Sequence, residues 1–203
     1  RYAIIDDAKY QTEDSILVKD VLKTLQELAK LHRKQLNIPI IGVTGTNGKT
    51  TTKELISRIL SSKYITYATQ GNLNSQIGVA ISILEIKKYH DIAVIEMGAN
   101  REGEIKNLCE IVQPTEGIIT NIGYAHLEGF GSLEGIIRTK IELYKSILQN
   151  NGTIFINSED AILLEKGKDN LKITYGKGKD SNYPAEIINK FPFISIKIGS
   201  TAI

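Results

Sequence analysis

The chain has 203 residues, of which 41% are hydrophobic and 24% charged, as is typical of a soluble globular protein. Its 25 basic and 23 acidic residues leave a net charge of +2, which offers no electrostatic basis for binding nucleic acid or a membrane surface. The single cysteine, Cys109, excludes an internal disulfide and fits a reducing compartment, and no apolar run approaches the roughly 20 residues of a membrane span.

The beginning of the chain carries no recognisable chemistry. It is not a signal peptide, and because it starts at Arg1 rather than Met we expect a processed or excised piece. Residues 1–18 are predicted to be extended or irregular. From Asp20, apolar residues recur at three- and four-residue spacing, which predicts a helix. We therefore divide the chain into an entry segment with its helix, residues 1–37, and a main domain, residues 38–203.

A glycine-rich loop follows the first apolar run of the main domain. Residues 38–43 are apolar and mostly β-branched, which predicts a buried strand, and residues 54–60 have helical spacing. Between them lies Gly45-Thr-Asn-Gly-Lys-Thr50. A strand, a glycine-rich turn, Lys-Thr and a helix form the layout of a phosphate-binding loop. The glycines let backbone N–H groups point at a phosphate, and the helix presents its N-terminal amides.

This layout predicts roles for individual residues of the loop. Lys49 is expected to reach the β- and γ-phosphates of a nucleotide, and the Thr50 hydroxyl to ligate Mg²⁺. The usual spacing has a glycine where Val43 stands, so an ordinary strand-to-helix turn is the alternative on this stretch alone. The predicted phosphate-binding residues are Gly45, Thr46, Asn47, Gly48, Lys49, Thr50 and Thr51.

The rest of the chain alternates between short apolar runs and helical patterns. Strands are predicted at 64–67, 91–96, 117–121 and 153–157, helices at 77–84, 104–112 and 132–149, and loops at 69–78 and 123–131. This alternation indicates an α/β fold, a mostly parallel sheet with helices on both faces. After Gly167 three short runs, 172–175, 185–189 and 193–198, have no helix between them, which predicts a small antiparallel patch near the C-terminus.

Polar residues follow several of the predicted strands. Ligands of open α/β sheets bind outside the carboxyl ends of the strands, where Glu96 and Asn121 are expected to lie. A carboxylate at Glu96 suits Mg²⁺, although it could instead cap the next helix or pair with a lysine. His126 lies in the glycine-rich loop past the third strand, which makes a metal or phosphate role worth testing against simple solvation. We assign no function to His32 or His90.

Lys140 lies on the apolar stripe of the helix at 132–149, between Ile137 and Tyr144. One interpretation is a lysine whose stem is buried while its amine reaches water. The other is a desolvated lysine with a lowered pKa, which can be neutral and nucleophilic. A neutral amine can add CO₂ to form a carbamate, and a carbamate is an anionic oxygen ligand suited to Mg²⁺.

The combination of these motifs resembles the Mur ligases. The phosphate loop alone would not be specific, but the resemblance covers about residues 15–160, and the family tolerates a residue other than glycine at position 43. The matching runs are Gly45–Thr51, Gly71–Asn74 with Ile77-Gly78, Ile95–Asn100, Asn121–Ser132 and Lys140.

The resemblance implies an ATP-dependent, amide-forming ligase of peptidoglycan precursor synthesis in the cytoplasm. ATP would phosphorylate the C-terminal carboxylate of UDP-N-acetylmuramoyl-tripeptide, and the amine of D-alanyl-D-alanine would attack the acyl phosphate. The runs Glu96–Asn100 and His126–Gly131 favour this member over a tripeptide-forming ligase or folylpolyglutamate synthase. A non-catalytic nucleotide-binding protein on a phosphate-loop fold is a further alternative, although a mere binder needs no second metal site.

The resemblance also implies two Mg²⁺ sites. Thr50 and Glu96 would serve one ion, and His126 would serve the second, bridged by a carbamylated Lys140. Together with Lys49 on the phosphates, His126 and Lys140 are the expected catalytic residues. The two ions would neutralise the charge of phosphoryl transfer.

Asn72 and Asn74 match a family motif near the muramyl substrate, which implies a substrate-binding role. Mur ligases have an N-terminal domain for the uridine nucleotide, a central ATP-binding domain and a C-terminal domain. This chain is expected to hold the entry helix and a C-terminally incomplete central domain. We expect a monomer that by itself binds nucleotide weakly at most.

Overall fold

A parallel sheet forms the centre of the computed structural model, which describes residues 2–124, 127–168, 172–199 and 201–202. Neighbouring strands of this part of the sheet are all parallel. The four inner strands are rich in isoleucine and valine, and most of these side chains are buried, as expected for a sheet covered on both faces. In spatial order they are β4 (Thr66–Ala68), β5 (Ile92–Glu96), β3 (Ile40–Thr44), β6 (Glu116–Ile119), β7 (Thr153–Asn157) and β8 (Lys172–Gly176).

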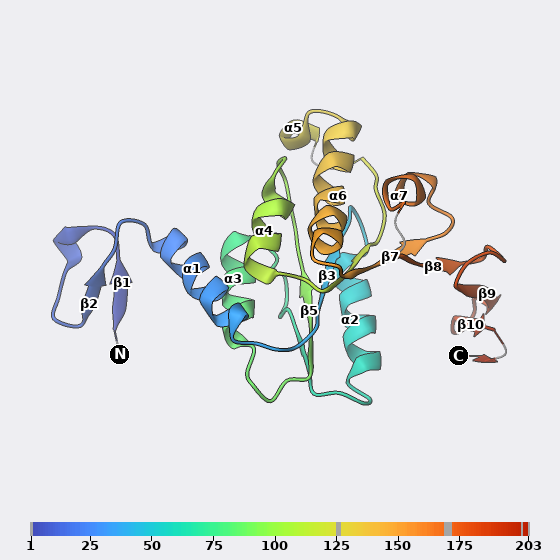
Figure 1. Cartoon of the computed structure of the whole chain (residues 1–203), viewed down its shortest axis with the longest axis horizontal. Helices are drawn as coiled ribbons and strands as arrows, with labels where there is room; N and C mark the ends of the chain where they lie inside the picture. Colours follow the sequence, from blue (N-terminus) through green and yellow to red (C-terminus); the bar gives the residue numbers. More distant parts are fainter. Residues whose placement is uncertain (1, 125–126, 169–171, 200, 203) are drawn as a thin grey trace.

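Helices cover both faces of the sheet, as predicted. On one face, four helices pack against one another, and on the other α2 (Lys49–Leu60) packs on β5, β4 and β3 (Figure 1). This division follows from the right-handed crossovers, because only the connection through α2 runs across the sheet in the opposite direction. The four helices are α1 (Val21–Lys34), α3 (Gln76–Glu85), α4 (Glu104–Val112) and α6 (Leu133–Gln149).

Most predicted elements are confirmed, and their ends follow local hydrogen bonds. Asp20 caps α1, and Ser132 caps α6 by accepting a bond from the N–H of Gly135. Helix α2 begins at Lys49, five residues before its apolar pattern, because the threonines of its first turns carry no periodic signal. Strand β4 starts two residues later than predicted, since the N–H of Tyr64 still bonds to the turn that ends α2.

Two short helices were not predicted. The segment 123–131, expected to be loop, contains the one-turn helix α5 (Leu127–Phe130). A second helix, α7 (Ala161–Lys166), begins after the cap residue Asp160 and buries only Leu163, which is too little for an apolar pattern. Because α7 supplies the crossover between β7 and β8, the latter strand joins the parallel sheet.

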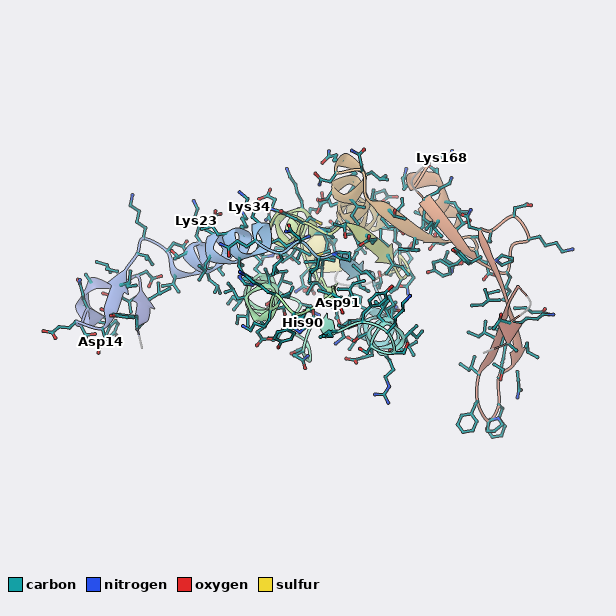
Figure 2. All side chains as sticks on the ribbon, turned by 60° about the horizontal axis from the view of Figure 1, so that its bottom comes forward. Asp14, Lys23, Lys34, His90, Asp91 and Lys168 are labelled. Carbon is teal, nitrogen blue, oxygen red and sulfur yellow. The ribbon has the colours of Figure 1, made fainter. Side chains whose placement is uncertain are left out.

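The predicted antiparallel patch is therefore smaller than expected. Strand β8 is parallel to both of its neighbours, and only β9 (Tyr183–Asn189), β10 (Ser195–Ile198) and β11 (Thr201–Ala202) pair antiparallel with one another. These strands extend the sheet and project from the body of the molecule (Figures 1 and 2).

The N-terminal segment lies at the other end of the molecule (Figure 1). A separate two-stranded parallel sheet joins β1 (Ala3–Ile5) and β2 (Ser15–Leu17), with the 3₁₀ turn η1 (Ala8–Tyr10) between them. The division of the chain at residue 37 stays a prediction. None of the helices in the described ranges is long and apolar enough to cross a membrane.

Arg33 ties the entry helix α1 to the main domain. The side chain is only 7% exposed, and its Nε and Nη2 donate to the carbonyls of Val112 (2.8 Å) and Gln113 (3.0 Å) at the end of α4. Its Nη1 donates to the carbonyl of Leu36 at 2.8 Å. The guanidinium thus satisfies carbonyls that a helix end leaves without partners.

We predict that Arg33→Met lowers the free energy of unfolding by about 2–4 kcal/mol, because buried carbonyls lose a charged donor. The control is Lys34→Met, since Lys34 lies on the exposed side of the same helix (Figure 2) and its loss should change stability by less than about 0.5 kcal/mol. Urea unfolding followed by circular dichroism measures both. Equal losses in the two variants would show that the three hydrogen bonds contribute nothing specific.

Candidate active site

The loop between β3 and α2 has the conformation that a phosphate-binding loop requires. Gly45 and Gly48 have positive φ values of +146° and +75°, a region that favours glycine. A Cβ atom at Gly45 would also overlap the Thr120 side chain, so this position has no room for another residue. The left-handed Gly48 directly precedes α2, so that the N-terminal amides of the helix face the loop.

Lys49 lies over this loop. Its Nζ donates to the carbonyls of Gly45 and Thr46, each at 3.0 Å. Thr50 and Thr51 follow in the first turn of α2, and both are exposed. The ammonium group is therefore held within the loop by carbonyl oxygens, at the end of the helix where its dipole already favours anions.

Glu96, at the end of β5, is an almost fully buried carboxylate with one free oxygen. It is 1% exposed, and its Oε1 accepts a hydrogen bond from Asn74 Nδ2 at 2.8 Å. Its backbone N–H donates to Thr69 Oγ1 at 3.0 Å. In the described part of the chain, Oε2 accepts no hydrogen bond. A buried carboxylate oxygen without a hydrogen-bond partner is costly, so this atom is suited to bind a cation.

Lys140 is buried beside the loop. It is 3% exposed, and its Nζ lies 5.8 Å from the centre of the Phe130 ring. Burial lowers the pKa of its amine to about 8, and the positive charge of Lys49 acts in the same direction. Burial of the side chain and the lowered pKa favour the desolvated state over a snorkelling side chain.

A cleft of about 360 Å³ brings these elements together at the carboxyl edge of the sheet. It joins the phosphate loop to the segments that follow β4 and β5 and to α6. Two lysines from different elements face this one space, which makes it a site for anions. Its polar lining includes Gly45, Thr46, Lys49, Asn74, Asn100, Glu104 and Lys140.

Other predicted site residues are not brought into the cleft. Thr50 and Asn72 are exposed and do not line it, and His126 lies outside the described residues. Across the ranges that the structure describes, no three His, Cys, Asp or Glu side chains gather around a possible metal position. Asn74 lines the cleft, but its side-chain amide binds Glu96.

The two remaining histidines have the structural contacts expected of them. His32 Nε2 lies 2.8 Å from the carbonyl of Ile86, and the N–H of Lys87 donates to His90 Nδ1 at 2.9 Å. His90 precedes β5 beside Asp91 (Figure 2), at the amino end of the strand and thus on the far edge from the cleft. Neither histidine contributes to the site.

Sequence reasoning missed the support beneath Glu96. Lys53 is fully buried, and its Nζ donates to the carbonyl of Thr69 at 2.7 Å and pairs with Glu54 Oε1 at 2.7 Å. The Thr69 hydroxyl accepts a hydrogen bond from the backbone N–H of Glu96. Lys53 of α2 therefore supports the position of Glu96 through Thr69. Lys53 stands three and seven positions before the partly buried Ile56 and Leu60, and this helical spacing could have revealed it.

Comparisons with known proteins agree with this arrangement. Residues 43–198 match the Mur ligase middle domain. The chain is 38% identical over 175 residues to UDP-N-acetylmuramoyl-tripeptide–D-alanyl-D-alanine ligase of Bacillus subtilis, an alignment that covers 86% of this chain and 38% of that protein.

Two solved structures share the fold over nearly the whole chain. MurF from Acinetobacter baumannii superposes with a TM-score of 0.86 at 34% identity, over 98% of this chain and 45% of that one. MurF ligase from Thermotoga maritima in complex with ADP gives a TM-score of 0.86 at 29% identity, over 100% of this chain and 48% of that one. The chain spans less than half the length of these relatives. The family model nevertheless matches most of the chain, and the chain belongs to the Mur ligase family.

Proposed function

We propose that this chain is the ATP-binding part of a UDP-N-acetylmuramoyl-tripeptide–D-alanyl-D-alanine ligase, acting in peptidoglycan precursor synthesis. The observation that carries the proposal is one cleft lined by Lys49 of the phosphate loop, the buried Lys140 and Asn74. Asn74 binds the Glu96 carboxylate, whose Oε2 has no hydrogen bond within the described ranges. Relatives that bear this ligase name support the choice of substrates. A monomer that works in the cytoplasm is part of the same proposal.

The reaction has two steps. The peptide's C-terminal carboxylate oxygen attacks the γ-phosphorus of ATP, the bond to the bridging oxygen breaks, and ADP leaves. The amine of D-alanyl-D-alanine then attacks the acyl carbon, loses a proton, and expels inorganic phosphate as the amide forms. Lys49, together with the loop Gly45–Thr51 and the amides that begin α2, would hold the phosphates and offset the charge that develops during transfer.

We assign one Mg²⁺ to Thr50 and Glu96, and a second to His126 and a carbamylated Lys140. When bound, the ions would neutralise charge on the transferring and accepting oxygens. Support for the first assignment comes from Glu96 Oε2, which is buried and lacks a hydrogen bond within the described ranges. Within the chain, Asn74 fixes the other oxygen and so orients the carboxylate.

The carbamate of Lys140 is supported by the environment of its amine. With a pKa of about 8, about a tenth of the amine is neutral at pH 7, against about one part in 3,000 for an ordinary lysine. The neutral nitrogen adds to the carbon of CO₂ and releases one proton, which leaves an anion. That anion removes the repulsion between Lys140 and Lys49 and presents two oxygens to a cation.

The alternative functions differ from this proposal either in the acceptor of the acyl group or in having no catalytic activity. A tripeptide-forming ligase or folylpolyglutamate synthase would use a single amino acid as the acceptor, and a regulator would bind ATP without turnover. A phosphate-release assay on a complete ligase that carries this chain distinguishes them. We expect D-alanyl-D-alanine to support phosphate release and single amino acids not to.

We also assign Asn72 and Asn74 to the binding of the muramyl substrate.

Lys49→Ala should weaken binding of a fluorescent ATP analogue by about 10- to 100-fold, because a charged hydrogen-bond donor to the phosphates is lost. In a complete ligase the same change should abolish acyl-phosphate formation. Lys63→Ala is the control, since Lys63 follows the far end of α2 and lies away from the loop. Fluorescence titration gives both affinities, and unchanged binding by the Lys49 variant would remove this lysine from the site.

Glu96→Gln keeps the size of the side chain and an oxygen for Asn74 but removes the charge. We expect the Mg²⁺ concentration that half-saturates nucleotide binding to rise about tenfold or more. Glu116→Gln serves as the control, because Glu116 begins β6 and therefore lies at the opposite edge of the same sheet. A Glu96 variant with the Mg²⁺ dependence of the wild type would contradict the metal assignment.

Lys140→Ala should inactivate a complete ligase, and added short carboxylates should restore part of the rate by occupying the vacated space. Lys140→Arg should resist rescue because its bulk and charge remain. In ¹³C NMR with labelled bicarbonate, a carbamate signal should grow as the pH rises through about 8, since the lowered pKa makes the amine neutral above that value. Lys145→Ala, on the exposed side of the same helix, should retain both activity and signal. Full activity of Lys140→Ala without added acid would end the assignment.

A further inference from the structure

The segment after β6 is hydrogen-bonded to the phosphate loop. Asn121 Oδ1 accepts a bond from the N–H of Asn47 at 3.1 Å, and Asn121 Nδ2 donates to the carbonyl of Asn47 at 2.9 Å. The Asn121 carbonyl accepts from the N–H of Thr46 at 3.0 Å. Thr120 Oγ1 adds a second donor to the Asn47 carbonyl, at 2.6 Å. Both polar backbone groups of Asn47 are thus bound by the segment that follows β6.

The side-chain amide of Asn121 acts here as an additional peptide group. It carries one acceptor and one donor at the spacing of a backbone C=O and N–H, so it can pair with Asn47 as an adjacent strand would. Asn47 has no partners within a helix or strand, because it lies in the loop between β3 and α2. Asn121 therefore determines the orientation of the Asn47 peptide, which the loop's own glycines leave free.

This pairing limits which amides can face a phosphate. The N–H groups of Thr46 and Asn47 point at Asn121, whereas the first four N–H groups of α2, which begins at Lys49, have no partners within the helix. Because the N–H groups of Thr46 and Asn47 point at Asn121, the N–H groups at the start of α2 are the donors that remain for an anion. The same orientation also leaves the carbonyl of Thr46 free to hold Lys49 Nζ.

We propose that Asn121 is a positioning residue that keeps the phosphate loop in its nucleotide-binding shape through the Asn47 peptide. The proposal rests on the proposed function only in taking this loop as the nucleotide site. A direct contact between the Asn121 side chain and the nucleotide is disfavoured, because its Oδ1 and Nδ2 are both bound to Asn47. Asn121 is therefore not itself a catalytic residue.

The test combines two variants with a matched control. Asn121→Ala removes both side-chain bonds. Asn121→Asp keeps an acceptor for the N–H of Asn47 but places a carboxylate oxygen against its carbonyl. The control, Asn182→Ala, removes an asparagine of the C-terminal region that likewise accepts bonds from backbone and hydroxyl, in this case from Thr174 (2.8 and 2.9 Å).

The first readout is amide hydrogen exchange of this chain, followed by NMR. In Asn121→Ala the N–H of Asn47 should exchange at least tenfold faster, whereas that of Thr46 should change little because its acceptor is the Asn121 backbone carbonyl. In Asn121→Asp the N–H of Asn47 should remain protected. The control should leave both amides unchanged. A general loss of stability would accelerate both amides together, so this pattern separates positioning from unfolding.

The second readout is the affinity for a fluorescent ATP analogue. Both Asn121 variants should bind it about tenfold or more weakly, with Asn121→Asp the weaker, and Asn182→Ala should bind like the wild type. Wild-type affinity in Asn121→Ala despite fast exchange at Asn47 would overturn the positioning role while leaving the nucleotide site intact. Absence of binding by a complete wild-type ligase that carries this chain would instead overturn the proposed function, and with it the role assigned to Asn121.

Discussion

The parallel alignment of β3 between β5 and β6 is the constraint on which the whole site depends. In the register of these strands, Val43 lies opposite Glu96 on one side and opposite Ile118 on the other. The loop that follows β3, the carboxylate that ends β5 and the polar segment after β6 therefore leave the sheet at the same level. A slip by one residue would turn Glu96 to the other face of the sheet.

The site has an excess of positive charge in one open cleft. Two lysines, Lys49 and Lys140, and one carboxylate, Glu104, line this cleft. Glu96 does not line it, but is hydrogen-bonded to Asn74, which does. Burial lowers the pKa of Lys140, and repulsion by the positive charge of Lys49 lowers it further. An anionic ligand, or conversion of one amine to an anion, would relieve this repulsion. The arrangement is therefore suited to phosphoryl chemistry rather than to structural stability.

Support for the site comes from residues that never face a ligand. Lys53 reaches Glu96 through Thr69, and Asn121 holds the loop through Asn47. Both supporting residues come from elements next to the one they hold, α2 beneath β5 and β6 beside the loop. Such supporting contacts hold the groups of the site in place through hydrogen bonds within the protein.

The sequence by itself determined the α/β alternation, the phosphate loop and the residues at the strand ends, because these depend on local spacing and on glycine chemistry. It also placed Lys140 on an apolar stripe. Only the tertiary structure decided that Asn74 contacts Glu96, that Lys53 is buried and that β8 joins the parallel sheet. The contact of Asn74 with Glu96 and the pairing of β8 join segments that are distant along the chain, which residue spacing does not reveal. The spacing of Lys53 is compatible with burial, but only the fold shows that its amine reaches the carbonyl of Thr69.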